Sequence, residues 1–452
     1  MSRLAYPTRP FDGHGRQHGL ERDAELTSVG PGTPGGEYLR RFWQPVALSS
    51  QVTDLPLAVR MLGEDLVIFR TAGGDVGLLE AHCSHRGASL EYGLVSEEGI
   101  RCCYHGWHFA CDGRILETPN DPTSRIRERL FHPAYPTREF RGIVFAYMGD
   151  PDTVPPFPHL DTFDEPGTEL IPFSLHYPCN WLQCSENTQD PVHSVFLHTR
   201  ISGAQFAESW GEMPSVEYVE TPLGMMNINV RRWRDNIWVR TTETILPNLN
   251  QAGALWETAD DEKCFLRVSL TRWMRPADDE NTLIIGWRHF NDRVDPDHKG
   301  IREEVGLERI DFLGQTEGRT QEERQRIPGD FEAIVSQRPV AIHALENLTG
   351  SDAGVALMRR LLRRQIRALA EGATPASPLL AETRPVPTYT QDTIMEIPRS
   401  GNEEAAEREL MRRMGREVAE AILSSAAEEV ATRRQSFAEA VTAIRDAARS
   451  GR

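Results

Sequence analysis

Short apolar runs separated by turn residues dominate the chain between about residues 46 and 150. Runs of this length with this punctuation are typical of β-strands. They are Pro56–Leu62, Leu66–Arg70, Val76–Leu79 and Ile143–Met148. The pattern predicts a small antiparallel domain. A short helix is predicted at Gly36–Trp43, directly after a glycine- and proline-rich turn at 30–36 that cannot lie inside a regular element.

Beyond a proline-rich joint at 151–158, the apolar runs become longer and mix with a helical pattern. Three stretches are predicted to be extended: Met225–Leu246, Cys264–Trp273 and Thr282–Phe290. Ser351–Leu369 instead carries apolar residues three and four positions apart, which indicates a helix with one buried face. We expect Ser351 to be its N-cap, with Asp352 in the first turn, where a carboxylate favours the helix dipole. These elements predict an α+β domain.

The last part of the chain is proline-rich up to residue 401 and helical from 402 to about 449. Its apolar positions form an i, i+4 stripe, Leu410, Met414, Val418 and Ile422. Such a stripe predicts a helix packed on its own domain or on a neighbouring subunit. The predicted division of the chain is therefore a tail with a short helix (1–45), a β domain (46–150), an α+β domain (151–372), and a proline-rich linker with a C-terminal helical extension (373–452).

Composition narrows the class of protein. The 452 residues include 50 basic and 67 acidic side chains, a formal charge of −17, and 39% hydrophobic residues, which is an ordinary globular composition. The excess of acid argues against nucleic acid and anionic membranes as partners. The chain contains no long apolar span and its start has no apolar signal region, so we expect neither a membrane anchor nor secretion, and a cytoplasmic location.

Two short segments combine cysteine with histidine. Cys83-Ser84-His85 is followed, after sixteen residues, by Cys102-Cys103-Tyr104-His105. Two thiolates and two imidazoles can hold a tetrahedral Zn²⁺, or a two-iron cluster in which one iron takes both cysteines and the other both histidines. A CxxH spacing selects Cys102 as the second thiolate, because Cys103 would leave only one residue before His105. Seven cysteines spread over this chain do not form a disulfide scaffold.

The sequence around these residues, at 83–90 and 103–113, resembles that of the Rieske [2Fe-2S] domain. The resemblance implies that Cys83, His85, Cys102 and His105 ligate the cluster, and that the domain carries one electron at a time. Structural zinc is the alternative, although zinc pairs usually occur in CxxC or HxxxH spacings.

A second group of acids and histidines lies within residues 180–199. On a straight helix Glu186, Asp190 and His193 would share one face, whereas His198 would lie about 140° from His193. Both imidazoles can reach one metal only if the helix is distorted or ends between them. Pro191 or a π-bulge would distort it. In the alternative interpretation Asp190 is an N-cap with Pro191 at N1, and the histidines are ordinary core or surface residues.

Together, the two groups resemble the α (terminal oxygenase) subunit of Rieske non-haem iron aromatic-ring-hydroxylating oxygenases, in their phthalate-dioxygenase-like branch. The resemblance implies that His193 and His198 bind a mononuclear Fe(II) with a carboxylate from the last long helix of the domain. Asp352 is predicted as that carboxylate, with Glu346 as the alternative. Asp190 would link the iron site to a Rieske histidine of the next subunit, and Glu186 would lie at the edge of the iron site.

The family implies a small all-β Rieske domain followed by an antiparallel-sheet catalytic domain of the helix-grip, START-like kind. It also implies a head-to-tail homotrimer or stacked hexamer. Electrons from NAD(P)H would arrive through a separate flavin/iron–sulfur reductase or a ferredoxin. The substrates would be O₂ and a small aromatic molecule, which is hydroxylated, dihydroxylated or oxidatively demethylated. A Rieske electron carrier without oxygenase activity and a zinc-stabilised binding protein are the alternative functions.

The stretch from Asn227 to Arg240 is rich in arginine and tryptophan. Arg232 and Arg234 lie two positions apart and would share one face of a strand, where their guanidinium groups suit an aromatic carboxylate. They are the predicted substrate-binding residues. A solvated strand face is the alternative interpretation.

Overall fold

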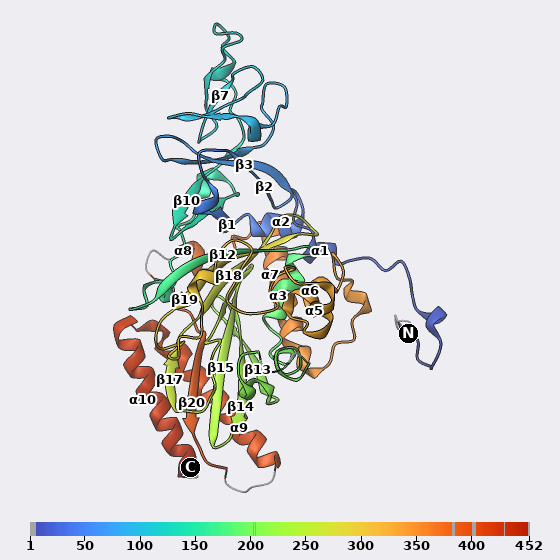
Figure 1. Ribbon diagram of the computed structural model, residues 1–452, viewed down its shortest axis with the longest axis vertical. Helices are drawn as coiled ribbons and strands as arrows, with labels where there is room; N and C mark the ends of the chain where they lie inside the picture. The colour runs from blue at the N-terminus through green and yellow to red at the C-terminus, as the bar shows by residue number, and fades with distance from the viewer. Residues whose placement is uncertain are drawn as a thin grey trace.

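Two bodies are stacked along the long axis of the molecule, and Figure 1 shows them in a computed structural model. It describes residues 6–201, 203, 205–381, 385–399, 404–428 and 430–450. The upper body is built from short strands and the lower body from one large sheet with helices around it. No helix in the described ranges is both long and apolar enough to cross a bilayer.

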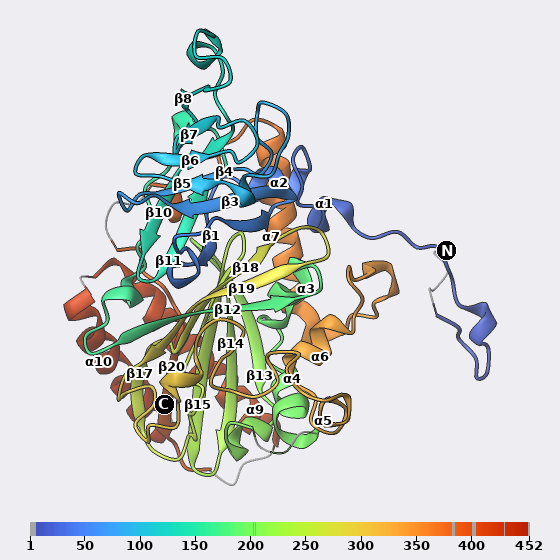
Figure 2. The same cartoon turned by 45° about the horizontal axis from the view of Figure 1, so that its top comes forward.

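The upper body contains three small antiparallel sheets, as the short apolar runs predict. One pairs β1 (Trp43–Leu48), β11 (Ile143–Tyr147) and β10 (Thr137–Phe140). The second pairs β2 (Leu57–Met61), β3 (Glu64–Arg70), β4 (Val76–Glu80) and β9 (Ala134–Tyr135). The third pairs β5 (Leu94–Val95), β6 (Gly99–Arg101), β7 (His108–Ala110) and β8 (Ile115–Glu117). The third sheet lies furthest from the lower body (Figures 1 and 2).

Two short helices precede the upper body, α1 (Ala24–Thr27) and α2 (Pro34–Leu39). The predicted helix at 36–43 starts earlier and ends earlier than expected. It starts earlier because Pro34 occupies the first turn and the Thr33 side chain accepts a hydrogen bond from Gly36 N. It ends at Leu39 because the chain must extend into β1 from Trp43.

The lower body is built on an antiparallel sheet that confirms the α+β class. Its main path runs through β12 (Glu169–Tyr177), β19 (Thr282–Phe290), β18 (Leu270–Pro276), β16 (Leu249–Ala252), β15 (Asn236–Ile245), β14 (Gly224–Trp233) and β13 (Ser215–Thr221). The predicted run 225–246 is a hairpin, because the chain turns at Arg234, whose φ is 53°. The predicted run 264–273 likewise holds two strands, β17 (Lys263–Leu266) and β18.

Long helices cover one face of this sheet. The apolar side chains Ile228 and Val230 of β14 share a core with α7 (Ala353–Ala370) and α9 (Glu404–Ser424). At Gly415 of α9 a Cβ would lie 2.7 Å from Val230 Cγ2, so glycine permits the close approach. α7 begins one residue later than expected, with Asp352 as its N-cap. Smaller helices complete the body: α3 (Trp181–Asn187), α4 (His193–Val195), α5 (Gln321–Arg326), α6 (Asp330–Val335) and α8 (Pro378–Ala381).

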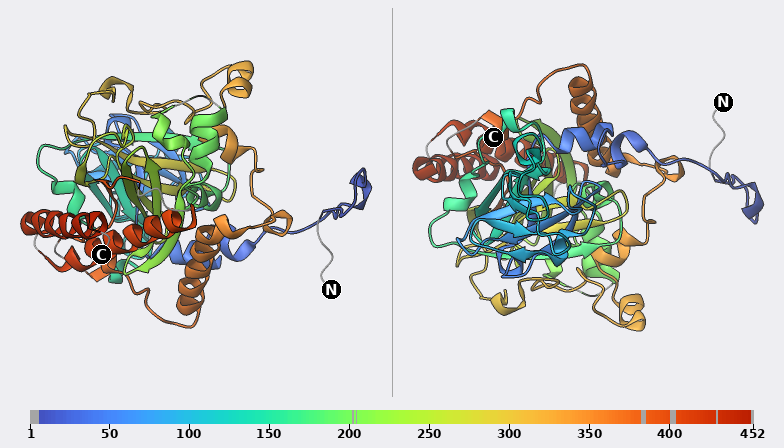
Figure 3. Two further views of the ribbon diagram at one scale, coloured as in Figure 1. Left: turned by 90° about the horizontal axis from the view of Figure 1, so that it is seen from below. Right: turned by 90° about the horizontal axis from the view of Figure 1, so that it is seen from above.

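The C-terminal segment belongs to the lower body and is not an extension behind a linker. Its proline-rich part contains β20 (Gln391–Glu396), which pairs with β15 and β17 in the large sheet. The helical stretch divides into α9 and α10 (Val430–Arg449), which lie side by side in Figure 3. The stripe predicted at 410–422 therefore packs on the protein's own domain.

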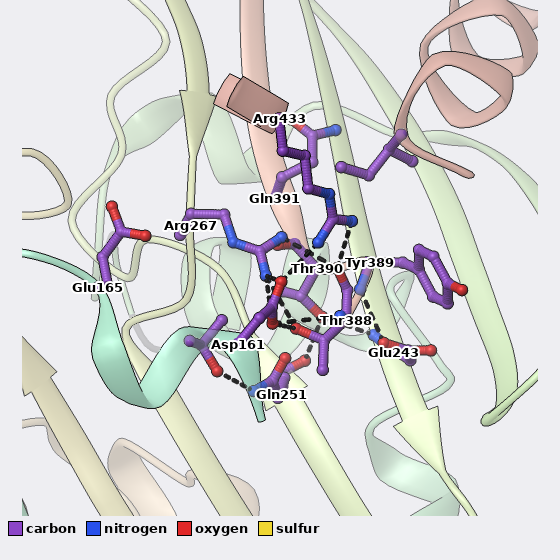
Figure 4. A network of polar contacts seen from close by, with 12 residues as sticks. Asp161, Glu165, Glu243, Gln251, Arg267, Thr388, Tyr389, Thr390, Gln391 and Arg433 are labelled. Carbon is purple, nitrogen blue, oxygen red and sulfur yellow. Dashed lines mark hydrogen bonds and ion pairs between the residues drawn. The ribbon is translucent and has the colours of Figure 1, made fainter. Parts of the chain in front are cut away.

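A buried network of polar groups joins this segment to the rest of the sheet (Figure 4). Asp161 accepts hydrogen bonds from Arg267 at 3.0 Å and from Arg433 of α10. Glu243 accepts one from Tyr389 N at 2.9 Å, and burial raises the pKa of this carboxyl to about 8. Because these groups are buried and paired, the C-terminal helices are fixed in place rather than loosely attached.

Candidate functional site

Two loops of the upper body have the same construction. Gly87 N donates to Cys83 O at 2.8 Å, and Gly106 N donates to Cys102 O at 3.0 Å. Both glycines have positive φ, 73° and 77°, a conformation that favours glycine. Each loop therefore turns tightly behind a cysteine and presents a thiol and an imidazole on the same side.

The four predicted ligands converge between these loops. The rings of His85 and His105 lie 4.6 Å apart between centroids. Cys83 and Cys102 are buried and hydrogen-bonded to each other, and burial together with this contact raises the pKa of the Cys83 thiol to about 11. Cys103 is exposed, so the geometry selects Cys102 as the CxxH spacing does. Two thiols on one side and two imidazoles on the other form the donor set that a [2Fe-2S] cluster with mixed ligation needs.

A second centre forms where a helix of the lower body is interrupted. α3 ends at Asn187, the chain resumes as α4 at His193, and Phe196–Ile201 continues as a π-helix. The wider π-turn brings His198 back toward His193, and their ring centroids lie 5.2 Å apart. The helix distortion that the two-histidine site requires is therefore present.

The third member of this centre is Asp330, the first residue of α6. Its Oδ1 lies 3.5 Å from His193 Nε2 and 3.4 Å from His198 Nε2, and the three ligand atoms lie within 4.8 Å of one another. Figure 2 shows α4 and α6 on the same side of the sheet. Two imidazoles and one carboxylate on one side of a metal leave positions open for other ligands.

The structure does not bring Asp352, the predicted third ligand, to the histidine pair. Its carboxylate accepts hydrogen bonds from Thr349 N at 2.6 Å and from Thr349 Oγ1 at 2.9 Å, which close the capping box of the 3₁₀ turn Gly350–Asp352 directly before α7. The alternative, Glu346, binds Arg359 at 2.5 Å and 2.8 Å. Both carboxylates have other partners, and neither joins the histidine pair.

Hydrogen bonds to neighbouring residues hold the side chains of His193, His198 and Asp330 in place. His193 Nδ1 donates to the carbonyl of Asp190, and His198 Nδ1 donates to Gln205 Oε1 at 2.6 Å. Asp330 accepts from Gln315 Nε2 at 2.7 Å and from Asn187 Nδ2 at 3.2 Å. Such bonds orient the rings so that both Nε2 atoms face the carboxylate, as in metal sites whose ligands are fixed by outer partners.

The charges at this centre favour a bound cation. Burial alone would raise the pKa of Asp330, but His198 and His193 hold it well below its usual range. Burial lowers the pKa of His193. At His198 burial also acts to lower the pKa, but the charge of Asp330 and the hydrogen bonds with Asp330 and Gln205 together raise it. An ionised carboxylate beside a neutral His193 is the protonation state that metal ligation requires, and a metal would displace the proton of His198.

A cavity of about 110 Å³ opens beside the three residues. One wall is polar and comes mainly from the sheet: Asn227, Asn229, Arg231, Arg240, Thr242, Asn250 and Arg272. A second group of lining residues is apolar and forms the apolar wall: Phe206, Trp210, Leu255, Leu270 and Phe312. A site with these two walls suits a small molecule that has an apolar body and a polar group.

The predicted substrate arginines do not line this cavity. Arg232 points to the helix-covered face, where it donates to Glu407 Oε1 at 2.5 Å. Arg234 is exposed and pairs with Asp260 at 2.8 Å. Since side chains alternate along β14, Arg231 faces the cavity instead, together with Asn229. The signal was present in the sequence, because 227, 229 and 231 are polar while 228 and 230 are apolar.

Glu186 and Asp190 have different surroundings. Glu186 lies outside the cavity and accepts a hydrogen bond from Arg359 Nε at 2.5 Å, and burial raises its pKa to about 7. The structure therefore does not place Glu186, predicted at the edge of the iron site, at the cavity beside the histidine pair. Asp190 does line the cavity, and its Oδ1 accepts from Val192 N at 3.0 Å and from His193 N at 3.3 Å.

Comparison with known proteins agrees with this geometry. Residues 42–136 match the model of the Rieske [2Fe-2S] domain. The tert-butanol monooxygenase / tert-amyl alcohol desaturase oxygenase subunit of Aquincola tertiaricarbonis is 45% identical over 402 residues, which cover 84% of each chain. The chain belongs to the Rieske non-haem iron oxygenases, as a terminal oxygenase subunit. The phenoxybenzoate dioxygenase subunit alpha of Ectopseudomonas oleovorans is 37% identical over 78% of this chain and 87% of that protein.

A solved structure agrees in fold. The Pseudomonas putida CBB5 NdmA QL mutant with theobromine matches with a TM-score of 0.57 and 20% identity, over 81% of this chain and 98% of that one. The oxygenase interpretation is thus confirmed over that of a simple electron carrier. Oxygenases of this family contain a Rieske [2Fe-2S] cluster and a mononuclear iron, and electrons from NAD(P)H reach them through a separate partner protein.

Proposed function

We propose that His193, His198 and Asp330 bind the mononuclear iron of this oxygenase, and that a small aromatic molecule is oxidised in the adjacent cavity. The convergence of these three side chains on one cavity is the observation that carries the proposal. When bound there, Fe(II) supplies the activation of O₂. The electrons would come from the cluster of Cys83, His85, Cys102 and His105. Dependence on NAD(P)H favours the cytoplasm as the compartment.

The protein's own residues position the reactants. Gln205 and the Asp190 carbonyl hold the two imidazoles, and Arg231 supports the same turn by donating to Ser194 Oγ at 2.9 Å. The apolar wall would hold the body of the substrate and exclude water from it. Phe206 lies 5.3 Å from His198 between ring centroids, so an aromatic ring could stack beside the iron site. The relative named for phenoxybenzoate supports an aromatic substrate, and the relative named for tert-butanol provides the competing substrate class.

Substrate-dependent O₂ uptake tests this function. The purified oxygenase, with a surrogate reductase and NADH, would be screened against benzoates, phthalates, methoxy-aromatics and tert-butanol. We expect at least one aromatic compound to stimulate O₂ uptake and to yield a hydroxylated or demethylated product. Stimulation by tert-butanol alone would contradict the aromatic assignment. Absence of any stimulation in a protein with full iron and sulfide would contradict the site.

We also propose a head-to-tail homotrimer, alone or stacked as a hexamer, in which Asp190 links the iron site to His105 of the neighbouring subunit. Strands β6 and β7 flank the Cys102–His105 loop. They lie at the end of the molecule away from the large sheet (Figures 1 and 2). Tyr104, beside His105, is 58% exposed and could contact a neighbour. Asp190 is held against His193, and its position at the cavity suits a bridging role.

Mixed subunits test this arrangement. Oligomers of Cys102→Ser alone would lack the cluster, and oligomers of His193→Ala alone would lack the mononuclear iron. If electrons cross between subunits, co-expressing the two variants with different tags should restore turnover in the doubly purified mixed oligomer. If each chain passes electrons only to its own iron site, the mixed oligomer will be as inactive as its parents.

A further inference from the structure

Three arginines line the cavity, and two of them have partners. Arg231 donates to Ser194 Oγ and thereby supports the turn that carries the histidines. Arg240 forms an ion pair with the buried Asp392 at 3.2 Å. The protein itself therefore supplies partners for these two guanidinium groups. It supplies no such partner for Arg272, on β18, within the described residues.

Arg272 has no counter-ion across the sheet. Its neighbours on the adjoining strands are Asn250 of β16 and Gly286 of β19, and neither carries a charge. Its Nε is buried without a hydrogen-bond partner, and Arg272 forms no ion pair within the described residues. Asn250 also lines the cavity, and its Oδ1 is likewise buried without a partner. Two unsatisfied polar atoms thus lie on neighbouring strands at one cavity wall.

A guanidinium without a partner at this cavity wall lowers the stability of the fold. Burial lowers the pKa of Arg272, yet a guanidinium does not give up its proton at physiological pH. Arg272 is half-buried and its Nε is shielded from solvent, and charged groups with little access to water are usually paired or bind something. Asp330 is the opposite charge with the largest effect on the pKa of Arg272, but Asp330 lies between the two histidines. A cation held there would neutralise Asp330 and leave Arg272 without compensation.

We propose that Arg272 binds a carboxylate of the substrate, with Asn250 beside it, while the apolar wall holds the rest of the molecule. This inference rests on the proposed function and adds the class of substrate, an organic acid. A guanidinium matches a planar carboxylate through two parallel N–H···O bonds, which fixes orientation as well as affinity. A substrate whose carboxylate is held by Arg272 on β18 would have a fixed orientation, which would determine which of its carbon atoms faces the iron site. Arg272 is therefore a specificity-determining residue.

A matched pair of probes tests this role. Benzoate and benzamide have nearly the same shape, and only benzoate carries the charge. Their binding would be measured by calorimetry on the iron-loaded oxygenase without reductase, so that turnover plays no part. We expect the wild type to prefer benzoate. Arg272→Gln should weaken benzoate binding by about 10- to 100-fold, the value of a hydrogen-bonded charge, and leave benzamide binding within about twofold.

Two further variants sharpen the test. Arg234→Gln removes an exposed arginine outside the cavity and should leave both probes unaffected. Arg272→Lys keeps the charge but loses the planar fork, and should recover part of the affinity for benzoate. The inference is overturned if the wild type does not bind benzoate, if it shows no preference for it, or if Arg272→Gln weakens both probes equally. Iron and sulfide analysis of the same samples separates the two claims, because missing mononuclear iron contradicts the proposed function itself.

Discussion

Replacing Asp330 with alanine should remove the mononuclear iron and lower substrate-dependent O₂ uptake by at least about 100-fold, since even the loss of an outer-shell partner costs 10- to 100-fold. Asp330 is the only carboxylate that meets His193 and His198 within the described residues. Without it, two imidazoles hold the metal weakly. Iron should fall from three atoms per chain to the two of the [2Fe-2S] cluster, and the visible spectrum of that cluster should persist.

Asp352→Ala is the matched control for this substitution. Both aspartates lie at the start of a helix, but the Asp352 carboxylate only closes the capping box of Thr349 in the turn before α7. Its loss should cost about 1 kcal/mol of stability and leave the iron content unchanged. Loss of the mononuclear iron in Asp352→Ala, with retention in Asp330→Ala, would reverse the assignment. His193→Ala should behave as Asp330→Ala does.

Replacing Cys102 with serine should abolish the Rieske spectrum and all reductase-dependent turnover. The Cys102 thiol is buried against Cys83, where a cluster would join the two loops. Serine oxygen is a much poorer ligand for iron than thiolate. Cys103→Ser is the control, since this neighbouring thiol is exposed. Absorption, EPR and sulfide analysis should show the cluster in Cys103→Ser and not in Cys102→Ser, and the opposite pattern would refute the ligand choice.

Local spacing was enough to predict the four side chains that converge between the two loops of the upper body. The loop from Cys102 to His105 brings its ligands together within a few residues, so little depends on the rest of the fold. The sequence also indicated that His193 and His198 need a distorted helix, because their angular separation on a straight helix is a local property. The π-helix at Phe196–Ile201 supplies that distortion.

The third ligand could not be found in the same way. Asp330 and Asp352 both lie at helix starts, and local patterns do not separate them. The choice depends on α6 packing against α3, which is a contact between segments about 140 residues apart. The side of β14 that faces the cavity, in contrast, could have been predicted from the sequence. Arg232 and Arg234 are two positions apart, as residues on one face of a strand are. Polar and apolar residues alternate at 227–231, however, and this alternation indicated that Arg231 faces the cavity and Arg232 the helices.

The C-terminal segment shows a further limit of sequence patterns. Five prolines between 372 and 401 suggest a linker, yet β20 forms within this stretch and joins β15 and β17. Pairing with distant strands stabilises it there, and Arg267 and Arg433 donate buried hydrogen bonds to Thr388 O just before the strand. Long-range pairing of this kind leaves little local signal, because the burial arises only when the distant strands meet.

The central claim is that His193, His198 and Asp330 together hold the catalytic iron. Anomalous X-ray diffraction at the iron edge, from crystals of the iron-loaded oxygenase, tests it most directly. The account predicts one mononuclear peak at coordination distance from both Nε2 atoms and the Asp330 carboxylate, apart from the cluster between the two cysteine loops. A peak beside Asp352, or within the group formed by Glu186, His343 and Glu346, would contradict it.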